Sequence, residues 1–458
     1  MHCWSWIADP GEFMIKVITY GTYDLLHYGH IRLLERARAL GDYLIVGVTS
    51  DDYDKTRGKI NNQQTLMERI AAVKATGLAD EVIVEEYEGQ KIDDIQKYGV
   101  DIFTVGSDWE GKFDYLKEYC QVIYLDRTEG VSSSMIRSDE HRIRIGLIGN
   151  PDTELTSLAK FMREMPYVNG MDAAAIYGSR SFSGLKHFDN YDEFLDTVDA
   201  VYVASHPTKH FRQIETALRN HKHVLCESPI ALKEEHYTKL TDLAEANHCV
   251  LMDAVKTAYT TAYERLLLIL KSGKIGQVVS VDSTCTSLRD VENYSDRDVR
   301  ENWNTITEWG PVALLPIFQI LGTDYKDIRI VSKTLDSDRQ FDIFTKINLE
   351  YDDAVASVRI GKGVKSEGEM IISGTKGYLI VPAPWWKTDY FEIRYENPAE
   401  NRRYFYQLDG EGIRYEIVAF SRAITTGSRY SFINKDVSRA ICSVMQKFYQ
   451  GQVRYLGC

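Results

Sequence analysis

The chain has 458 residues, of which 44% are hydrophobic and 26% are charged, and its formal net charge is −13 at pH 7. This length is too great for one ordinary hydrophobic core, so we expect two to four domains of a globular enzyme rather than a disordered or fibrous chain. The acidic balance argues against a nucleic-acid partner, no apolar run reaches the roughly 18 residues of a membrane span, and we expect no secretion signal.

The cysteines are scattered, without a C-x-x-C pair or any short regular spacing. This pattern predicts free thiols in a reducing cytoplasm rather than disulfides or a zinc site. We expect residues 1–13 to be an extension without a catalytic part, because they precede a well-defined strand and a second Met at position 14. The cysteines are Cys3, Cys120, Cys226, Cys249, Cys285, Cys442 and Cys458.

Strands and helices alternate through the first third of the chain, which predicts an α/β domain with a mostly parallel sheet. Gly41 closes the first helix, as glycine often does at a helix C-terminus. The predicted strands are residues 15–21, 42–50, 81–86, 101–108 and 120–128, and the predicted helices are residues 29–41, 66–78 and 91–100.

A second alternating series begins at residue 142, after a short polar hinge at residues 132–141, and predicts a dinucleotide-binding-type Rossmann domain. After about residue 275 strands follow one another, which predicts an α+β domain with a large, mostly antiparallel sheet. We therefore expect domains at residues 14–139, 140–258 and 259–458. The late strands are residues 278–287, 327–335, 342–351, 354–361, 368–374 and 391–396.

The motif HYGH places His27 and His30 at a strand-to-helix junction. The helix N-terminus offers unpaired N–H groups to a triphosphate, and two imidazoles on its first turn can stabilise charge that develops at phosphorus. Gly29 lets the backbone approach closely. Taken alone, the pair also fits surface histidines, whereas a zinc site would need further ligands that the neighbouring sequence does not offer.

The motif does not stand alone, because GTYDLLHYGH, ERI, GSDWEGKFDYLKEYC and RTEGVSSSMI follow in order over residues 14–138. This set resembles the cytidylyltransferase family of nucleotidyltransferases, most nearly the glycerol-3-phosphate cytidylyltransferases. The resemblance implies that CTP, with Mg²⁺, and a polyol phosphate give a CDP-polyol and pyrophosphate. Glycerol 3-phosphate is the leading acceptor. By analogy, such products feed bacterial teichoic acids and capsular polysaccharides.

The resemblance also implies roles for individual residues. His27 and His30 contact the CTP phosphates, Lys59 reaches the α-phosphate from a mobile loop, and Arg127 holds the nucleotide. Asp24 helps to hold the acceptor or the metal. The remaining nucleotide-binding residues are Gly21, Thr22, Tyr23, Gly29, Arg69, Asp108, Trp109, Thr128, Ser132, Ser133 and Ser134, the three serines starting a helix that faces the triphosphate.

Several of these residues also have plain structural interpretations. Asp24 fits a turn cap, Lys59 a solvated loop lysine, and Arg69 a helix-surface ion pair. Trp109 fits core packing, and the serines fit an ordinary helix N-cap, which is compatible with their functional role.

Residues 142–450 resemble the glucose–fructose oxidoreductase and inositol dehydrogenase superfamily (Gfo/Idh/MocA). The resemblance rests on residues 191–232, LMDAVKTAY, SGKIGQVVSVDS, SGTKGYLIVPAPWW and GEGIRYEI. It implies the fold, and it suggests that Gly149, Ser179, Arg180, His206 and Glu227 contact a nicotinamide cofactor. His210 lies in the same stretch as His206, and both also fit core or loop-capping histidines.

The functional signatures of this second family are degenerate. The phosphate loop GxGxxG reads GNPDTE, and the lysine of the EKP signature is replaced by Ser228. The DxGxH signature reads EWGPV, with Glu308 at the acid and Val312 at the histidine. Lys256 is a conceivable replacement base, although it also fits a structural ion pair.

Three functional hypotheses follow. The first is a cytidylyltransferase with an inactive oxidoreductase-like domain, and the second is a bifunctional enzyme that also oxidises or reduces the polyol. In the second case NADP is favoured over NAD, because YGSR lacks the acidic residue that selects NAD. The third is a nucleotide-binding scaffold without turnover. We expect a cytoplasmic homo-oligomer, as is common in both families.

Overall fold

The computed structural model describes residues 14–24, 26, 28–51, 53, 64–87, 89–126, 142–149, 155–168, 170–178, 181–182, 184–335, 341–406, 408–426 and 432–457. The chain divides into two compact units, Met1–Glu140 and His141–Cys458. The three domain ranges predicted above remain predictions.

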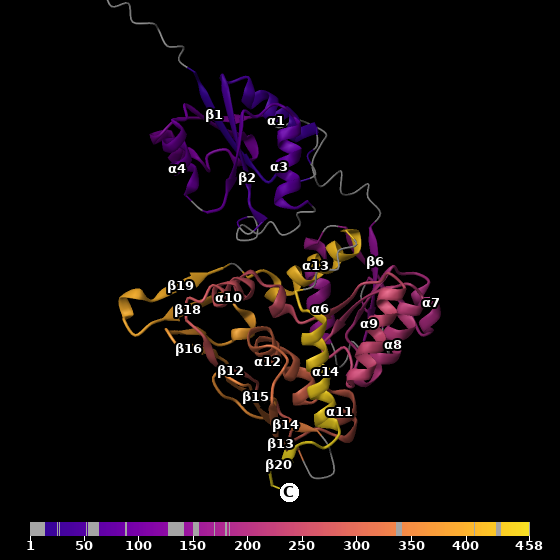
Figure 1. Cartoon of the computed structure of the whole chain (residues 1–458). Helices are drawn as coiled ribbons and strands as arrows, with labels where there is room; N and C mark the ends of the chain where they lie inside the picture. Colours follow the sequence, from indigo (N-terminus) through magenta and orange to yellow (C-terminus); the bar gives the residue numbers. More distant parts are fainter. Residues whose placement is uncertain are drawn as a thin grey trace, which may run out of the picture. The chain divides into compact units, whose positions relative to one another are not determined.

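Unit 1 contains a five-stranded parallel sheet with strand order β3-β2-β1-β4-β5 (Figure 1). Its centre is fully buried, because β1 and β2 consist largely of Val, Ile and Leu. The strand order reverses between β1 and β4, so the loops that follow these strands open a crevice at the carboxyl edge. The strands are β1 Lys16–Gly21, β2 Tyr43–Thr49, β3 Glu81–Glu85, β4 Ile102–Gly106 and β5 Gln121–Leu125.

Helices cover the sheet of unit 1 and bury two apolar clusters against it. The start of α3 is fixed by a capping box, in which the Thr65 hydroxyl accepts from the Glu68 N–H and the Glu68 carboxylate accepts from the Thr65 N–H. The helices are α1 Tyr28–Arg38, α3 Leu66–Ala75 and α4 Gln90–Tyr98, with 3-10 turns η1 Ser107–Trp109 and η2 Asp114–Glu118.

Unit 2 begins with a six-stranded parallel sheet of order β11-β10-β9-β6-β7-β8. Here the order reverses between β6 and β9. The strands are β6 Ile143–Ile148, β7 Met171–Tyr177, β8 Lys186–Phe188, β9 Ala200–Val203, β10 His223–Glu227 and β11 Leu251–Ala254. The helices are α6 Leu155–Glu164, α7 Tyr191–Leu195, α8 Pro207–Arg219 and α9 Glu234–Ala246, with 3-10 turns η3 Met165–Tyr167 and η4 Lys256–Tyr259.

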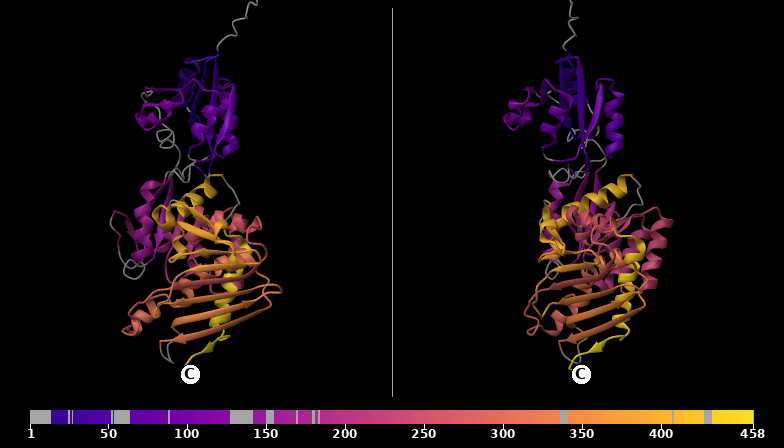
Figure 2. Two further views of the ribbon diagram at one scale, coloured as in Figure 1. Left: turned by 90° about the vertical axis from the view of Figure 1, so that its left-hand side faces the viewer. Right: turned by 60° about the vertical axis from the view of Figure 1, so that its left-hand side comes forward.

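A nine-stranded sheet of order β19-β18-β17-β16-β12-β15-β14-β13-β20 completes unit 2. It is mostly antiparallel, as predicted, and the pairs β12–β15 and β13–β20 are parallel. Figure 2 shows it as one broad layer with α14 behind its strands. The strands are β12 Val278–Thr286, β13 Asp327–Thr334, β14 Asp342–Glu350, β15 Val355–Gly361, β16 Met370–Gly374, β17 Tyr378–Val381, β18 Tyr390–Arg394, β19 Arg402–Phe405 and β20 Arg454–Tyr455.

For the last domain the sequence predicted an α+β fold but located only its strands, and the structure shows where its helices lie. The helix α12 packs on β12, β14 and β15 although Pro311 and Pro316 lie inside it. The helices are α10 Thr261–Lys271, α11 Asp296–Glu301, α12 Thr305–Leu321, α13 Ile413–Thr426 and α14 Lys435–Tyr449, with 3-10 turns η5 Trp385–Lys387, η6 Pro398–Glu400 and η7 Gly410–Gly412.

Three further findings bear on the predictions made from composition and cysteine spacing. Within the described ranges, no helix combines the length and the apolar character that crossing a membrane requires. The cysteines for which the structure gives a position, Cys120, Cys226, Cys249, Cys285 and Cys442, are free thiols. In that same part of the chain, no group of three or more His, Cys, Asp or Glu side chains is arranged to hold a metal ion.

Candidate functional site

The crevice of unit 1 is built around the loop between β1 and α1. Tyr23 adopts a left-handed backbone with φ of 54°, and its buried ring lies edge-on to His30, with ring centroids 5.5 Å apart. Gly21 is required here, because a Cβ atom would come within 2.9 Å of the Tyr23 ring. The tight turn thus brings His30, on the first turn of α1, to the carboxyl edge of the sheet, where Gly29 also lies.

Asp24 and Arg69 connect this loop to neighbouring elements. The Asp24 Oδ1 atom accepts from the Gln64 N–H at 2.9 Å, which joins the loop to the segment before α3. The Arg69 side chain is fully buried, and its Nη1 donates to the carbonyl oxygens of Thr22 at 2.7 Å and Thr49 at 2.8 Å. Its Nη2 pairs with Asp51. Arg69 is therefore buried rather than on the helix surface, and it positions the loops after β1 and β2. Its predicted nucleotide contact stays a prediction.

A buried ion pair lies beside the crevice, between α4 and the end of β3. Lys91, on α4, pairs with Glu85, whose other oxygen accepts from the Thr49 hydroxyl at 2.9 Å. The Lys91 ammonium also lies 4.6 Å from the centre of the Tyr20 ring, a favourable cation–π contact. A cavity of about 40 Å³ lies among these side chains and is lined by Tyr20, Gly21, Thr22, Thr49, Glu85, Lys91, Phe103, Val105, Trp109 and Phe113.

Sequence reasoning did not include Lys91 among the site residues. A signal was available, because Lys91 lies four residues before Ile95 and hence on the same face of α4, and Ile95 is buried. A lysine on the apolar face of a helix beside a crevice needs a partner or a ligand.

The other predicted residues of unit 1 are only partly described. Asp108 and Trp109 lie on η1, directly after β4, and Trp109 packs against Phe113 with ring centroids 5.8 Å apart. Trp109 lines the same cavity as Gly21 and Thr22, whereas Asp108 and His30 follow β4 and β1 at the carboxyl edge without lining that cavity. The predictions for His27, Lys59, Arg127, Thr128, Ser132, Ser133 and Ser134 lie outside the described residues.

In unit 2, His206 and His210 have different environments. His206 is the N-cap residue of α8, and its ring accepts from the Thr208 N–H, while burial lowers its pKa. His210 is fully buried between the carbonyl oxygens of Ser205 and Pro229, and burial lowers its pKa to about 4. Only His206 therefore stands at the carboxyl edge of the sheet, whereas His210 is a core histidine.

Two interacting carboxyl groups are the half-buried Glu227, at the end of β10, and the buried Glu416, on α13. The Tyr202 hydroxyl donates to Glu227, and burial raises the pKa of Glu227. Burial and the nearby Glu227 also raise the pKa of Glu416 well above its ordinary value. The Glu416 Oε2 atom is buried and has no hydrogen-bond partner within the described part of the chain. Gly149 directly follows β6, and Ser179 and Arg180 lie outside the described residues.

The degenerate signature on α12 contains a buried ion pair that the sequence did not predict. Glu308 pairs with Arg289 and, at 2.7 Å, with the Lys362 ammonium. The side chain of Lys362 is only 1% exposed, and burial lowers its pKa. Lys256, the conceivable replacement base, instead pairs with Glu411 at 3.0 Å.

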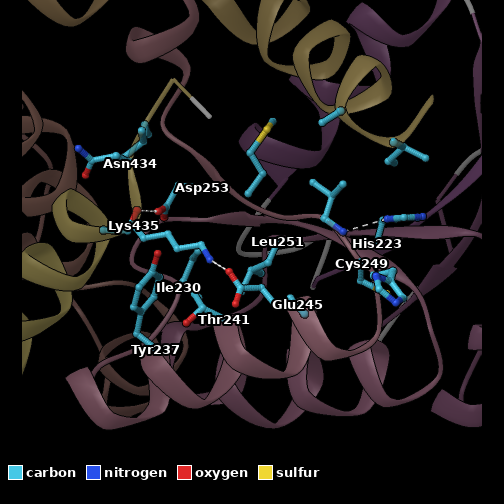
Figure 3. A pocket seen from close by; sticks show the side chains of 18 residues that line it. His223, Ile230, Tyr237, Thr241, Glu245, Cys249, Leu251, Asp253, Asn434 and Lys435 are labelled. Carbon is cyan, nitrogen blue, oxygen red and sulfur yellow. Dashed lines mark hydrogen bonds and ion pairs between the residues drawn. The ribbon is translucent and has the colours of Figure 1, made fainter. Parts of the chain in front are cut away.

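Unit 2 also contains a mostly apolar cavity of about 630 Å³ between α9, β11 and α13–α14 (Figure 3). Lys435 and Glu245 pair at its edge, and the Val250 N–H donates to His223 Nδ1 at 3.0 Å. Of the predicted cofactor residues that have described positions, none lines this cavity.

Comparison with known proteins separates the two units. The family model described as "Cytidylyltransferase-like" matches residues 18–139. Over 126 residues the chain is 52% identical to the glycerol-3-phosphate cytidylyltransferase of Bacillus spizizenii, covering 28% of this chain and 97% of that protein. It is 50% identical, also over 126 residues, to the enzyme of the same name from Staphylococcus aureus, of which it covers 95%.

Unit 2 matches a different family. The model "Oxidoreductase family, NAD-binding Rossmann fold" (Gfo/Idh/MocA) matches residues 169–254. The 3-ketoreductase KijD10 from Actinomadura kijaniata, solved with NADP and TDP-benzene, has a TM-score of 0.60 at 20% identity, covering 69% of this chain and 99% of that one. The UDP-N-acetylglucosamine 3-dehydrogenase GnnA from Acidithiobacillus ferrooxidans has a TM-score of 0.54 at 17% identity, covering 67% and 96%.

At these identities the structural likeness establishes the fold of unit 2 and leaves its activity open. The chain therefore belongs, through unit 1, to the cytidylyltransferase family of nucleotidyltransferases, and it carries in unit 2 a domain of the Gfo/Idh/MocA oxidoreductase family.

Proposed function

We propose that the chain transfers CMP from CTP to a polyol phosphate, with glycerol 3-phosphate as the leading acceptor, and releases pyrophosphate. The observation that carries this proposal is the 52% identity to a glycerol-3-phosphate cytidylyltransferase over 97% of that protein's length. The crevice formed by Gly21, Thr22, His30 and Trp109 agrees with it, since such crevices bind nucleotides in open α/β sheets.

In this proposal the protein supplies position and charge rather than a covalent nucleophile. His27 and His30 donate hydrogen bonds to the phosphate oxygens that gain charge as the acceptor attacks the α-phosphorus, and Lys59 and Arg127 neutralise the triphosphate. Mg²⁺ accompanies CTP. Asp24 and Asp108 are carboxylates at the crevice and suit this cation, which takes one or two carboxylates together with substrate phosphates.

Lys91 completes the proposed acceptor site. Its ammonium lies beside the cavity that also contacts Thr22 and Trp109. A buried ammonium there gives the acceptor phosphate a charge-assisted partner, because a phosphate can share Lys91 with Glu85 or replace that carboxylate.

Pyrophosphate release from CTP, measured with glycerol 3-phosphate and with longer polyol phosphates, tests the proposal. We expect His27→Ala and His30→Ala each to lower the rate by about 10²-fold or more, because each variant removes one donor to the developing charge. His221→Ala, which changes a histidine of unit 2, serves as the control. Wild-type-like turnover in either crevice variant, with circular dichroism unchanged, contradicts the phosphate-binding role.

A second candidate function is an NADP-dependent oxidoreductase activity in unit 2, and the buried Lys362–Glu308 pair favours it. The EKP lysine is replaced by Ser228. Lys362, however, supplies another ammonium, which lies close enough to His206 to lower the pKa of its imidazole. The described residues suit a nicotinamide cofactor in part. Gly149 follows β6, and His206 and Glu227 provide polar groups at the carboxyl edge. The bound cofactor would supply hydride transfer to or from a carbonyl.

Fluorescence of NADPH and NADH titrated into the full chain tests this second candidate. Micromolar NADPH binding that His206→Ala weakens supports a bifunctional enzyme that makes a modified CDP-polyol. No binding of either cofactor to a folded chain leaves a cytidylyltransferase with an inactive oxidoreductase-like domain.

A further inference from the structure

Three lysines of unit 2 converge on a single carboxylate. They come from three separate elements, α6, η4 and η5, and the Glu411 side chain accepts from all of them. We refer to them as the lysine triad, which comprises Lys160, Lys256 and Lys387.

The distances are those of direct charge-assisted hydrogen bonds. The Glu411 Oε2 atom accepts from Lys160 at 2.7 Å and from Lys256 at 3.0 Å, while Oε1 accepts from Lys387 at 2.7 Å. Burial opposes ionisation of Glu411, but the three ammonium groups hold its pKa well below its usual range. Three positive charges thus face one negative charge.

Among the neighbouring carboxylates that the structure describes, Glu164 and Asp409 pair with Arg414 rather than with the lysine triad. Glu227 and Glu416 lie close enough to Lys256 to interact with its charge, but burial raises the pKa of both and thereby favours their neutral forms. A cluster with excess positive charge, about a quarter to a third exposed at each lysine, suits an anion with more oxygens and more charge than one carboxylate.

The backbone that carries Glu411 is unusual. Glu411 has a φ of 56°, and it lies between Gly410 and Gly412, which have φ values of 55° and 93°. A left-handed backbone is unfavourable for a non-glycine residue. The strained Glu411 backbone and its flanking glycines provide a turn that can change conformation and withdraw the carboxylate.

The backbone of Trp386 lies next to the lysine triad, since its carbonyl oxygen accepts from the hydroxyl of Thr257, which follows Lys256. Trp386 directly precedes Lys387, and its ring meets the Trp309 ring at 62° with centroids 5.0 Å apart. The indole N–H of Trp309 is buried and has no acceptor among the residues that the structure describes. An aromatic pair this close to the triad backbone suits a phosphate ester with an organic group attached.

We propose that the lysine triad is a phosphate subsite of unit 2, which binds the phosphate or diphosphate of a phosphorylated or nucleotide-linked polyol. Glu411 occupies the subsite in the absence of this ligand and is displaced when it binds. The identity of the ligand as a polyol derivative rests on the proposed function of unit 1, whereas the anion subsite itself does not.

Isothermal titration of CDP-glycerol into the full chain tests the subsite, with inorganic phosphate titrated separately. The crevice of unit 1 contributes one binding event in every variant. We expect Glu411→Gln to tighten a second event by about tenfold or more, because it removes the competing charge, and Lys160→Ala and Lys387→Ala to weaken it by a similar factor. Lys239→Ala, which changes an exposed ion-paired lysine of α9, should leave it unchanged.

If the ion cluster is purely structural, Glu411→Gln should lower the melting temperature and should not create any affinity for the anion. The proposal is overturned if Glu411→Gln shows one binding event only, or if the second event is indifferent to Lys160→Ala and Lys387→Ala. If Glu411→Gln does not fold, Lys160→Ala and Lys387→Ala still test the subsite, because they leave residue 411 unchanged.

Site-resolved acetylation of lysines, read by mass spectrometry, gives an independent readout. CDP-glycerol should protect Lys160 and Lys387 in Glu411→Gln, and equal labelling with and without ligand contradicts the subsite.

If inorganic phosphate competes with CDP-glycerol for the second binding event, this supports an anion subsite whatever the polyol. Pyrophosphate release, assayed on the same variants, separates the proposed function of unit 1 from the anion subsite of unit 2. If no pyrophosphate is released, the proposed function is overturned, whereas the subsite is judged from the second binding event alone.

Discussion

At the scale of single residues, each unit contains a buried lysine beside its candidate site. Lys91 in unit 1 and Lys362 in unit 2 are almost completely buried, and each pairs with one glutamate. Removing water from an ammonium is costly, so a buried lysine is kept only where a partner or a ligand compensates it. Neither lysine belongs to a motif that can be recognised from the sequence alone.

The proposed role of Lys91 in binding the acceptor phosphate leads to a prediction with two separable readouts. Lys91→Met should raise KM for the acceptor by about tenfold or more and leave KM for CTP nearly unchanged, because the acceptor phosphate loses a charged partner. It should also destabilise unit 1 by about 3–5 kcal/mol, because the Glu85 carboxylate is left buried and unpaired. Steady-state kinetics and thermal melts measure the two effects.

A double variant separates the two readouts. Glu85→Gln combined with Lys91→Met removes the uncompensated charge, so it should restore stability without restoring KM. The exposed Lys97 of the same helix provides the control variant Lys97→Met. If KM recovers together with stability, Lys91 is structural only.

At the scale of elements, the contact between β11 and α14 fixes one buried carboxyl group. Asp253 accepts from the Ser438 hydroxyl, and burial raises the pKa of Asp253 to about 6. The folded state therefore binds a proton more tightly than the unfolded state does between about pH 4 and pH 6. The stability that this group contributes is present at low pH and is lost as the pH rises through 6.

Asp253→Asn should remove this pH dependence. We expect the variant to be more stable than the wild type by about 2–3 kcal/mol at pH 7, with the difference vanishing near pH 4. Denaturant melts of unit 2 at several pH values measure this, and Asp242→Asn, on the outer side of α9, is the control. A difference that does not change with pH contradicts the assignment.

Element α12 shows why local pattern fails in the last domain. Pro311 and Pro316 ordinarily disfavour a helix interior, because each removes an N–H donor and crowds the preceding turn. The helix forms nevertheless, since Asn304 caps its start and its apolar residues are buried against the large sheet. Tertiary burial outweighs propensity there, and this information is not local in the sequence.

At the scale of the whole molecule, the chain consists of two compact units with their own sheets and cores. Arg69 allows the two cores to be perturbed separately. It is fully buried and hydrogen-bonded to the carbonyl oxygens of Thr22 and Thr49, so Arg69→Met leaves two buried acceptors and Asp51 without their partner.

We expect scanning calorimetry to resolve two unfolding transitions. Arg69→Met should lower the transition temperature of unit 1 only, because it reduces the free energy of unfolding of that unit by about 3–5 kcal/mol. Arg32→Met, which changes an exposed arginine of α1, should shift neither transition. A single transition that Arg69→Met displaces as a whole would show that the two units unfold together.

The sequence by itself determined the family of unit 1, the two alternating α/β series and the mostly antiparallel sheet, because these depend on local periodicity and on ordered motifs such as HYGH. It also located the edge of the sheet where Gly21, Thr22 and Trp109 line one cavity, since parallel strands end at a common edge. Only the tertiary structure decided that Arg69 is a buried connector, that His210 is a core residue, and that Lys91, Lys362 and the lysine triad face glutamates. Those contacts join residues distant in sequence, such as Lys256 and Glu411, and their energies depend on burial, which chain order does not encode.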